Sequence, residues 1–472
     1  MRFGAIFLVS AIAVLVAGCG GNPSSNEAAS LPGYDREVST PLDDRSSRLA
    51  PFQRQSAHEK LIYTFQGQAY GTGRNDGEAP YAALLADSTG NLYGTTAGGG
   101  VGSGTVFILR PSGSAYKESV LYSFGAASKT TDGDGPRCTL ISDKTGALYG
   151  TTTFGGTYTY GTVFKLTSSK GKFTESILHE FKAGTDGAWP YGGVIADANG
   201  DLYGTTANGG NPAYCSGSGP GGCGTVYKLT PSGSSYKETI LYAFKGGATD
   251  GENPYAALVM DKSGALYGTT PYGFYSSSVG SVYKLTPNGS NYTESIIDGF
   301  GHKNDGAGPA PFGKLAIDSK GIIYGTAERG GKGDSKPSSP CPGPDGTGCG
   351  MVFELMGSGS TYTEKIIYDV TDYKKGTYPN AGVTLDPNGN IYGTMTEYGA
   401  STYGAVYELV PSAKGFKVKV LHSFTSVPDG ATPFGEVILD KAGTLFGMTG
   451  DGGTKNGYCE PNGCGTVFTI AH

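Results

Sequence analysis

Short apolar runs and polar turns alternate along the chain from residue 76 onward. In the first unit, apolar and aromatic residues concentrate in 81–86, 91–96, 105–110 and 116–124, and each run has the length of a strand. The turns between them include 87–90 (Asp-Ser-Thr-Gly), where Asp can cap its own backbone and Gly can adopt positive φ. The pattern predicts four short antiparallel strands joined by tight turns.

This unit occurs seven times, and its most regular segment begins Tyr-Gly-Thr. The segment starts at Tyr93, Tyr149, Tyr203, Tyr267, Tyr324, Tyr392 and, as Phe-Gly-Met, at Phe446. The spacings are 56, 54, 64, 57, 68 and 54 residues, which is the size of a four-stranded propeller blade. A coil of a β-solenoid would be much shorter. The sequence therefore predicts an all-β chain, a seven-bladed β-propeller of four-stranded antiparallel blades.

The two ends of the repeat region indicate how the ring closes. The last unit stops after its third strand, 465–470, and has no fourth. The segment 60–65, which precedes the first unit, matches the fourth strand of that unit at 120–124. We therefore expect the N-terminal strand to complete the last blade, which would leave no free sheet edge.

The N-terminus has the features of an export signal. Arg2 precedes a 15-residue apolar run, 3–17, which is shorter than the ~20 residues of a membrane-spanning helix. The run leads to Val-Ala-Gly-Cys, which resembles a bacterial lipobox and predicts a signal peptide over 1–19 with lipidation at Cys19. An ordinary secretory signal with an incidental Cys is the alternative. We expect a flexible tether over 20–57, the propeller over 58–472, and attachment to the outer membrane or cell surface through lipid on Cys19.

Cysteine usage agrees with export. Six of the remaining cysteines form close pairs, each predicted to be a disulfide that fastens a long loop: Cys215 with Cys223, Cys341 with Cys349, and Cys459 with Cys464. Metal binding is the alternative, but no Cys-x-x-Cys or suitably spaced His supports it. Cys138 is left over and is expected to be a small buried residue. The net charge of −6 gives no basic face for nucleic acid, and neither a metal nor a cofactor is predicted.

The variable loops and the repeated Asp-Gly-x-x-Pro turns are expected on one face of the ring. Long variable loops on a rigid scaffold commonly carry function. An aromatic residue follows the Pro in five units, which suggests a ring of aromatic and acidic side chains around the channel mouth, suited to sugars or peptides. Packing between blades and capping of turns is the alternative explanation. The candidate ligand-binding residues are Tyr81, Asp186, Trp189, Tyr191, Asp250, Tyr255, Phe312, Phe434 and Glu436.

Catalysis receives little support from the sequence. No nucleophile elbow, zinc-protease helix motif or P-loop is present. Glu436 and Lys314 are charged at an innermost-strand position where other units carry Ala, Gly or Thr, so they are the charged pair to test near the axis. His179 and His422 occupy positions on the outermost strand and are expected to be surface residues.

Three segments together resemble a known repeat family. They are 92–96 (Leu-Tyr-Gly-Thr-Thr), 161–166 (Gly-Thr-Val-Phe-Lys-Leu) and 238–244 (Glu-Thr-Ile-Leu-Tyr-Ala-Phe). The chain is similar to the GloVer tandem repeat of bacterial proteins that use interchangeable anchors, and this resemblance implies an exported, surface-held domain. It implies no activity. We expect a binding or scaffold module for a glycan or protein, with a carbohydrate lyase or hydrolase, or a purely structural coat, as alternatives.

Overall fold

The computed structural model describes most of the repeat region. The described residues are 58–67, 75–125, 131–215, 219–233, 235–273, 279–301, 311–333, 348–454, 459 and 461–471. The predicted signal peptide 1–19 with Cys19, the predicted tether 20–57 and Cys341 lie outside them. Among the described residues, no helix has the length and apolar character required to cross a membrane.

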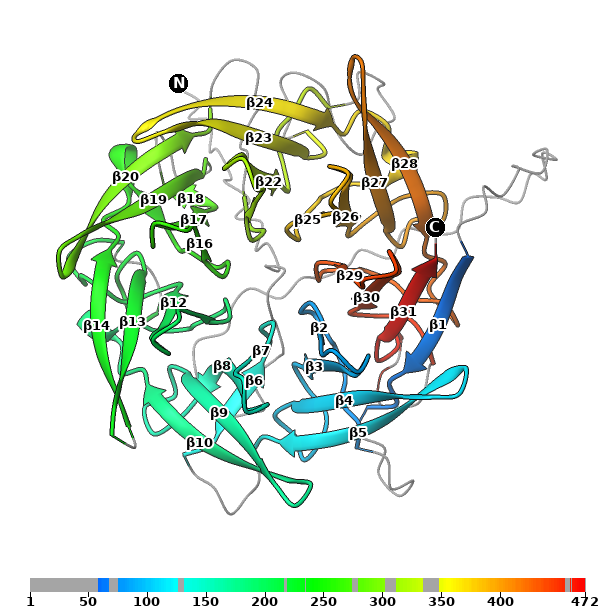
Figure 1. The fold of residues 1–472 in the computed structure, drawn as a ribbon, viewed down its shortest axis with the longest axis horizontal. Helices are drawn as coiled ribbons and strands as arrows, with labels where there is room; N and C mark the ends of the chain where they lie inside the picture. The colour runs from blue at the N-terminus through cyan, green and yellow to red at the C-terminus, as the bar shows by residue number, and fades with distance from the viewer. Residues whose placement is uncertain are drawn as a thin grey trace, which may run out of the picture.

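Seven antiparallel sheets surround a central axis, with the shortest strands innermost (Figure 1). Each blade has four strands in the order predicted by the repeat, with β6 (Gly133–Pro136) as an additional strand in the sheet of the second blade, and the seven-bladed propeller is confirmed. The innermost strands are β2 (Leu85–Ala86), β7 (Ile141–Ser142), β11 (Ile195–Ala196), β16 (Val259–Met260), β21 (Ala316–Ile317), β25 (Thr384–Leu385) and β29 (Ile438–Leu439). The second strands are β3 (Leu92–Thr96), β8 (Leu148–Gly155), β12 (Leu202–Thr206), β17 (Leu266–Thr270), β22 (Ile323–Ala327), β26 (Ile391–Met395) and β30 (Leu445–Thr449).

The two outer strands form a hairpin in six blades, whereas in the seventh they come from the two ends of the repeat region. The third strands are β4 (Thr105–Ser112), β9 (Thr162–Ser169), β13 (Thr225–Ser232), β19 (Ser281–Asn288), β23 (Met351–Ser358), β27 (Ala405–Ser412) and β31 (Thr466–Ala471). The fourth strands are β5 (Ala115–Ser123), β10 (Lys172–Glu180), β14 (Ser235–Ala243), β20 (Asn291–Gly299), β24 (Thr361–Asp369), β28 (Gly415–Ser423) and β1 (His58–Thr64).

The remaining elements lie in the connections. They are the short strands β6 (Gly133–Pro136), β15 (Gly251–Glu252) and β18 (Tyr272–Gly273), and the 3₁₀ turns η1 (Gly184–Asp186), η2 (Gly247–Thr249) and η3 (Tyr373–Lys375).

The ring closes as the sequence predicts. β1 pairs antiparallel with β31, with His58 opposite Ala471 and Thr64 opposite Thr466. Figure 1 shows this junction as the blue first strand beside the red last strand. The seventh blade therefore joins the two ends of the repeat region, and its sheet has the order β1-β31-β30-β29.

The hydrophobic core lies mainly between blades. Seven clusters of buried side chains each combine residues of two neighbouring blades. The Gly of Tyr-Gly-Thr makes this packing possible. A Cβ on Gly94 would lie 2.5 Å from Phe107 Cζ, and one on Gly204 would lie 2.4 Å from the Tyr227 hydroxyl. Glycine is required there because the large ring of the third strand crosses directly over the backbone of the second.

The Asp-x-x-Gly turns have a structural role, because each Asp side chain caps the backbone of its own turn. In the Asp-x-x-Gly turns, Asp87 Oδ1 accepts the backbone N–H groups of Thr89 at 2.8 Å and Asn91 at 3.1 Å. The other six turns repeat this arrangement.

The predicted disulfides Cys215–Cys223 and Cys459–Cys464 are confirmed. Cys349 is also disulfide-bonded, while its expected partner lies outside the described residues. Cys138 is buried and free.

Candidate functional site

A small cavity lies where the seven innermost segments converge. Each blade contributes the residues just before its innermost strand, and the cavity volume is ≈ 70 Å³. Small-molecule pockets usually have volumes of about 300–1,000 Å³. This cavity is therefore too small to enclose a ligand of ordinary size, and any ligand would have to lie across its mouth.

Six of the sequence-predicted site residues line this cavity. They are Tyr81, Tyr191, Tyr255, Phe312, Phe434 and Glu436. Phe312 is buried, at 2% exposure, and the other five are half-buried. The channel mouth is therefore aromatic, as the repeat predicts, but part of that aromatic surface serves the packing of the blades.

The aromatic residues form two arcs. Phe434 and Tyr81 meet edge to face with ring centroids 5.2 Å apart, which joins the seventh blade to the first. Tyr191 contacts Tyr255 at 5.0 Å, and Tyr255 contacts Phe312 at 5.9 Å, which joins the third, fourth and fifth blades. The first two pairs are edge to face and the third is tilted, and aromatic pairs contribute about 0.5–1.5 kcal/mol beyond their burial. The arcs consequently stabilise the ring while leaving half-buried rings at its centre.

Two polar residues separate the arcs. Arg137 takes the ring position in the second blade and Asn380 in the sixth, and both are buried. The Arg137 guanidinium lies 5.9 Å from the centroid of the Phe154 ring, a cation–π distance. Neither arc is therefore continuous around the channel, and the mouth combines apolar and polar positions.

A second repeated position lies two residues before the ring residue. Its backbone is left-handed in the described blades, with φ values of 55° at Ala79, 64° at Gly135, 59° at Trp189, 57° at Asn253, 58° at Tyr378 and 52° at Thr432. Such backbone is uncommon for residues other than glycine and concentrates at functional sites. Trp189 is half-buried, and its ring centroid is 6.3 Å from that of Phe154. Side chains of very different chemistry occupy this position, although its backbone conformation is the same in the described blades.

Glu436 and Lys314 both line the channel cavity, as the sequence suggested. The Glu436 side chain passes over the backbone of the sixth blade, which lies between the blades of Lys314 and Glu436. A Cβ on Gly382 of this sixth blade would lie 2.2 Å from Glu436 Oε1 and 2.3 Å from the Lys314 carbonyl oxygen. Burial raises the pKa of Glu436, and the positive charge of Lys314 acts in the opposite direction. The absence of a side chain at residue 382 leaves room for the Glu436 carboxylate beside the backbone of the sixth blade.

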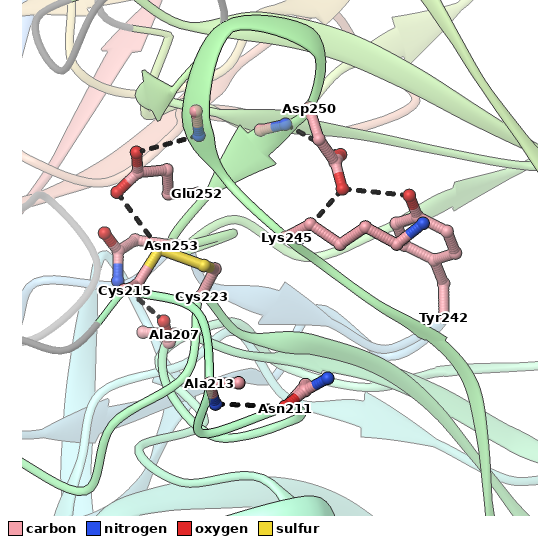
Figure 2. Close-up of a disulfide and its surroundings, with 12 residues drawn as sticks. Ala207, Asn211, Ala213, Cys215, Cys223, Tyr242, Lys245, Asp250, Glu252 and Asn253 are labelled. Atoms are coloured by element: carbon pink, nitrogen blue, oxygen red, sulfur yellow. Dashed lines mark hydrogen bonds between the residues drawn. A yellow bond between two sulfur atoms is a disulfide. The ribbon is translucent and has the colours of Figure 1, made fainter.

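Asp186 and Asp250 do not line the cavity. Asp250 is 5% exposed and accepts hydrogen bonds from the Tyr242 hydroxyl at 2.9 Å and from the backbone of Lys245 at 2.8 Å (Figure 2). Figure 2 also shows the Cys215–Cys223 disulfide beside Glu252 and Asn253. Asp186 similarly accepts the backbone N–H of Lys182 at 2.7 Å. Both carboxylates hold the connection between blades to an outermost strand.

A charged group near the mouth was not predicted from the sequence. Glu328 follows β22 directly, is 6% exposed, and has Oε1 3.6 Å from Arg329 Nε. Its Oε2 is buried and makes no hydrogen bond within the described part of the chain. Burial raises the pKa of Glu328 to about 7, while Arg329 lowers it and Glu397 raises it.

The group around Glu328 adjoins the aromatic ring through Tyr272, whose ring centroid is 5.9 Å from that of Phe312. Burial, followed by the charge of Glu328, raises the pKa of Tyr272 to about 12. A sequence signal for Glu328 did exist. The residue after the second strand is Ala, Thr, Pro or Gly in the other six blades, so Glu is the exception.

The repeat family follows from comparison with family models. The model for the Gloeobacter/Verrucomicrobia repeat matches residues 52–219 and 343–472. The chain belongs to this family. Membership agrees with the repeat segments that the sequence analysis identified, and it assigns no reaction or ligand to any residue of the chain.

A search of curated proteins found no match. Several solved structures resemble this one at low identity. A Bacteroides uniformis protein provisionally assigned as a 6-phosphogluconolactonase is 13% identical, with coverage of 88% of this chain and 100% of that one and a TM-score of 0.47.

Two further structures belong to sugar-related enzymes. The aldose sugar dehydrogenase of Streptomyces coelicolor is 10% identical, with coverage of 88% and 99% and a TM-score of 0.37. A variant of the NanB sialidase of Streptococcus pneumoniae is 11% identical, with coverage of 87% and 70% and a TM-score of 0.40. At these values the likenesses carry no argument about function.

Proposed function

We propose that this protein is a binding module of the bacterial cell envelope, held by lipid on Cys19, and that its propeller binds a glycan or a protein across the channel mouth. The observation that carries the proposal is the pair of half-buried aromatic arcs around the cavity. Aromatic faces combined with a few polar groups are typical of surfaces that bind sugars and peptides.

The small volume of the cavity favours binding across the surface over enclosure of a substrate. A cavity of ≈ 70 Å³ cannot exclude water around a sugar unit, whereas an extended polymer can lie over several blades at once. The variable left-handed positions, including Trp189 and Asn253, lie beside the ring and supply different chemistry in each blade. We propose that they provide specificity.

The test is retention of the full chain on immobilised envelope and plant polysaccharides. We expect retention on at least one of them, reduced about tenfold by Tyr191→Ala or Tyr255→Ala, which is the loss expected of an aromatic hot spot. Tyr158→Ala is the matched control, since Tyr158 is 44% exposed and does not line the cavity. Equal losses from all three variants would contradict the channel mouth as the site. If no polysaccharide retains the chain, the proposed partner is a protein, and crosslinking in the envelope would identify it.

The second candidate is a carbohydrate lyase or hydrolase, and the raised pKa of Glu328 favours it. A carboxyl group with a pKa of about 7 is suited to act as a general acid or base near neutral pH. Release of reducing or unsaturated ends from a retained polysaccharide, abolished by Glu328→Gln or Glu436→Gln, would replace the binding module with this enzyme.

A further inference from the structure

The outer contacts between blades follow a repeated chemical pattern. A Tyr of one outermost strand lies between two carboxylates, one from the following connection and one from the outermost strand of the next blade. The Tyr122 hydroxyl is 3.2 Å from both carboxylate oxygens of Asp132 and 3.0 Å from Glu175 Oε2. The phenol O–H thus joins the first and second blades by hydrogen bonding.

The second blade has His179 where this Tyr would be. His179 Nε2 lies 3.3 Å from Asp186 Oδ1 and 3.5 Å from Glu238 Oε1. The prediction that His179 is a surface residue is wrong, because β10 packs beside β14 and leaves its side chain only 14% exposed. His179 Nε2 and Glu238 Oε1 are both buried, and their 3.5 Å contact falls short of a well-formed hydrogen bond.

We propose that His179, Asp186 and Glu238 bind one Zn²⁺ ion between the second and third blades. Zn²⁺ binds His nitrogen and carboxylate oxygen at about 2.0–2.2 Å, and a tetrahedral arrangement places such ligand atoms roughly 3.3–3.6 Å apart. The two measured separations match that range. All three candidate ligand atoms lie within 4.8 Å of one another, as do those of a second group formed by Glu59, His422 and Asp429.

The surroundings of the three side chains suit a bound cation. Asp186 Oδ2 accepts the backbone N–H of Lys182 at 2.7 Å, which orients the carboxylate and leaves Oδ1 directed at the histidine. A cavity of ≈ 410 Å³ adjoins His179 and is also lined by Thr157, Glu180 and Lys182. Neither Asp186 nor Glu238 lines this cavity, so it borders the group only at the histidine.

The other histidine at this repeat position differs. His422 Nε2 is within hydrogen-bond distance of both oxygens of Asp429, at 3.2 and 3.0 Å. The ring nitrogen of His422 therefore pairs with one carboxylate, whereas His179 Nε2 lies at the longer distances of 3.3 and 3.5 Å from two carboxylates. His422 belongs to a similar group with Glu59 and Asp429, so His422→Tyr tests whether binding is specific to the group of His179.

The experiment uses the full chain without a histidine tag, stripped with a chelator and then dialysed against Zn²⁺. We expect one tightly bound Zn²⁺ per chain, and visible absorption typical of tetrahedral Co²⁺ when Co²⁺ replaces it. His179→Tyr introduces the residue that blades one, three, five and seven use at this position, so the fold should be kept. Its affinity should fall by more than the ~10–100-fold that loss of an outer-shell partner costs.

His422→Tyr should leave Zn²⁺ binding unchanged. Asp186→Asn is the second variant and should lose binding even if His179→Tyr fails to fold. Zn²⁺ should also raise the melting temperature of the wild type but not that of Asp186→Asn. Unchanged binding by either site variant, no stoichiometric binding by the wild type, or equal loss in His422→Tyr would overturn the assignment.

Discussion

The Thr95 hydroxyl donates a hydrogen bond across the blade boundary to the carbonyl oxygen of Cys138, at 3.1 Å. The equivalent threonine makes the same bond to the next blade at five further boundaries. Met448 takes this position in the seventh blade and cannot donate. The Thr of Tyr-Gly-Thr therefore has a defined role, since it ties the second strand of one blade to the innermost segment of the next.

Replacement of Thr326 by Val should destabilise the propeller. The Thr326 hydroxyl donates to the Ala381 carbonyl at 2.7 Å, and Val keeps the shape but leaves this acceptor without its partner. The cost should be about 1–3 kcal/mol in the free energy of unfolding, measured by denaturant titration. Thr326→Ser retains the hydroxyl and should lose less. Equal stability of Val and wild type would show that the bond contributes nothing net.

Replacement of Tyr283 by Phe should stabilise the protein. Tyr283 is fully buried, and its hydroxyl makes no hydrogen bond within the described residues. Phe occupies the corresponding position in four other blades, for example at Phe107. Removal of an unsatisfied buried hydroxyl should gain roughly 1 kcal/mol and raise the melting temperature. The reverse change, Phe164→Tyr, should lower it, and a lower melting temperature for Tyr283→Phe would contradict this account.

Glu328 should make stability depend on pH. Its pKa is raised from 4.5 to about 7 in the folded protein, mainly by burial. The folded state therefore retains a proton that the unfolded state releases between these values, and stability falls as pH rises from 4.5 to 7. The loss should approach roughly 3 kcal/mol. The Glu328→Gln variant stays neutral, so it should lack this pH-dependent loss of stability. Denaturant midpoints of the wild type and the variant, measured from pH 4.5 to 7, would show the difference. Parallel curves for the two proteins would refute it.

Trp189 should report on the loop fastened by Cys215–Cys223. A Cβ on Gly219 would lie 3.1 Å from Trp189 Cη2, so this loop covers the only tryptophan of the chain. Replacement of both cysteines by Ser should lower stability by about 2 kcal/mol and shift the tryptophan emission. The same replacement at Cys459 and Cys464 should lower stability without shifting the emission. A shift from the second pair alone would place the reporter elsewhere.

The fold could be predicted from sequence because its information is periodic. The Tyr-Gly-Thr segments give the blade number, and the lack of a fourth strand after the last third strand indicates the closure by β1. The ring of Tyr81, Tyr191 and Tyr255 could be predicted for the same reason, since each follows a Pro at one fixed point of the repeat. Spacing alone could not give the radial position of a loop residue.

The remaining features depend on contacts between units, which a single repeat does not reveal. Asp250 belongs to the connection that leads to the channel, yet its carboxylate points to Tyr242 on the outermost strand. His179 meets Glu238 only because neighbouring blades pack their outermost strands together. Glu328 differs from its counterparts in the other blades, but its burial depends on side chains from adjacent units.

The junction of β1 with β31 also determines how the ring responds to mechanical force. Six blades consist of strands that follow one another along the chain, whereas the seventh is joined across its two ends by backbone hydrogen bonds and side-chain packing, without a chain connection between β1 and β31. A pull on the chain before His58 therefore loads this one ladder first. Because His58 lies opposite Ala471 at the end of the antiparallel pair, the bonds would break one after another, and the propeller would open at a single seam while the other blades stayed intact.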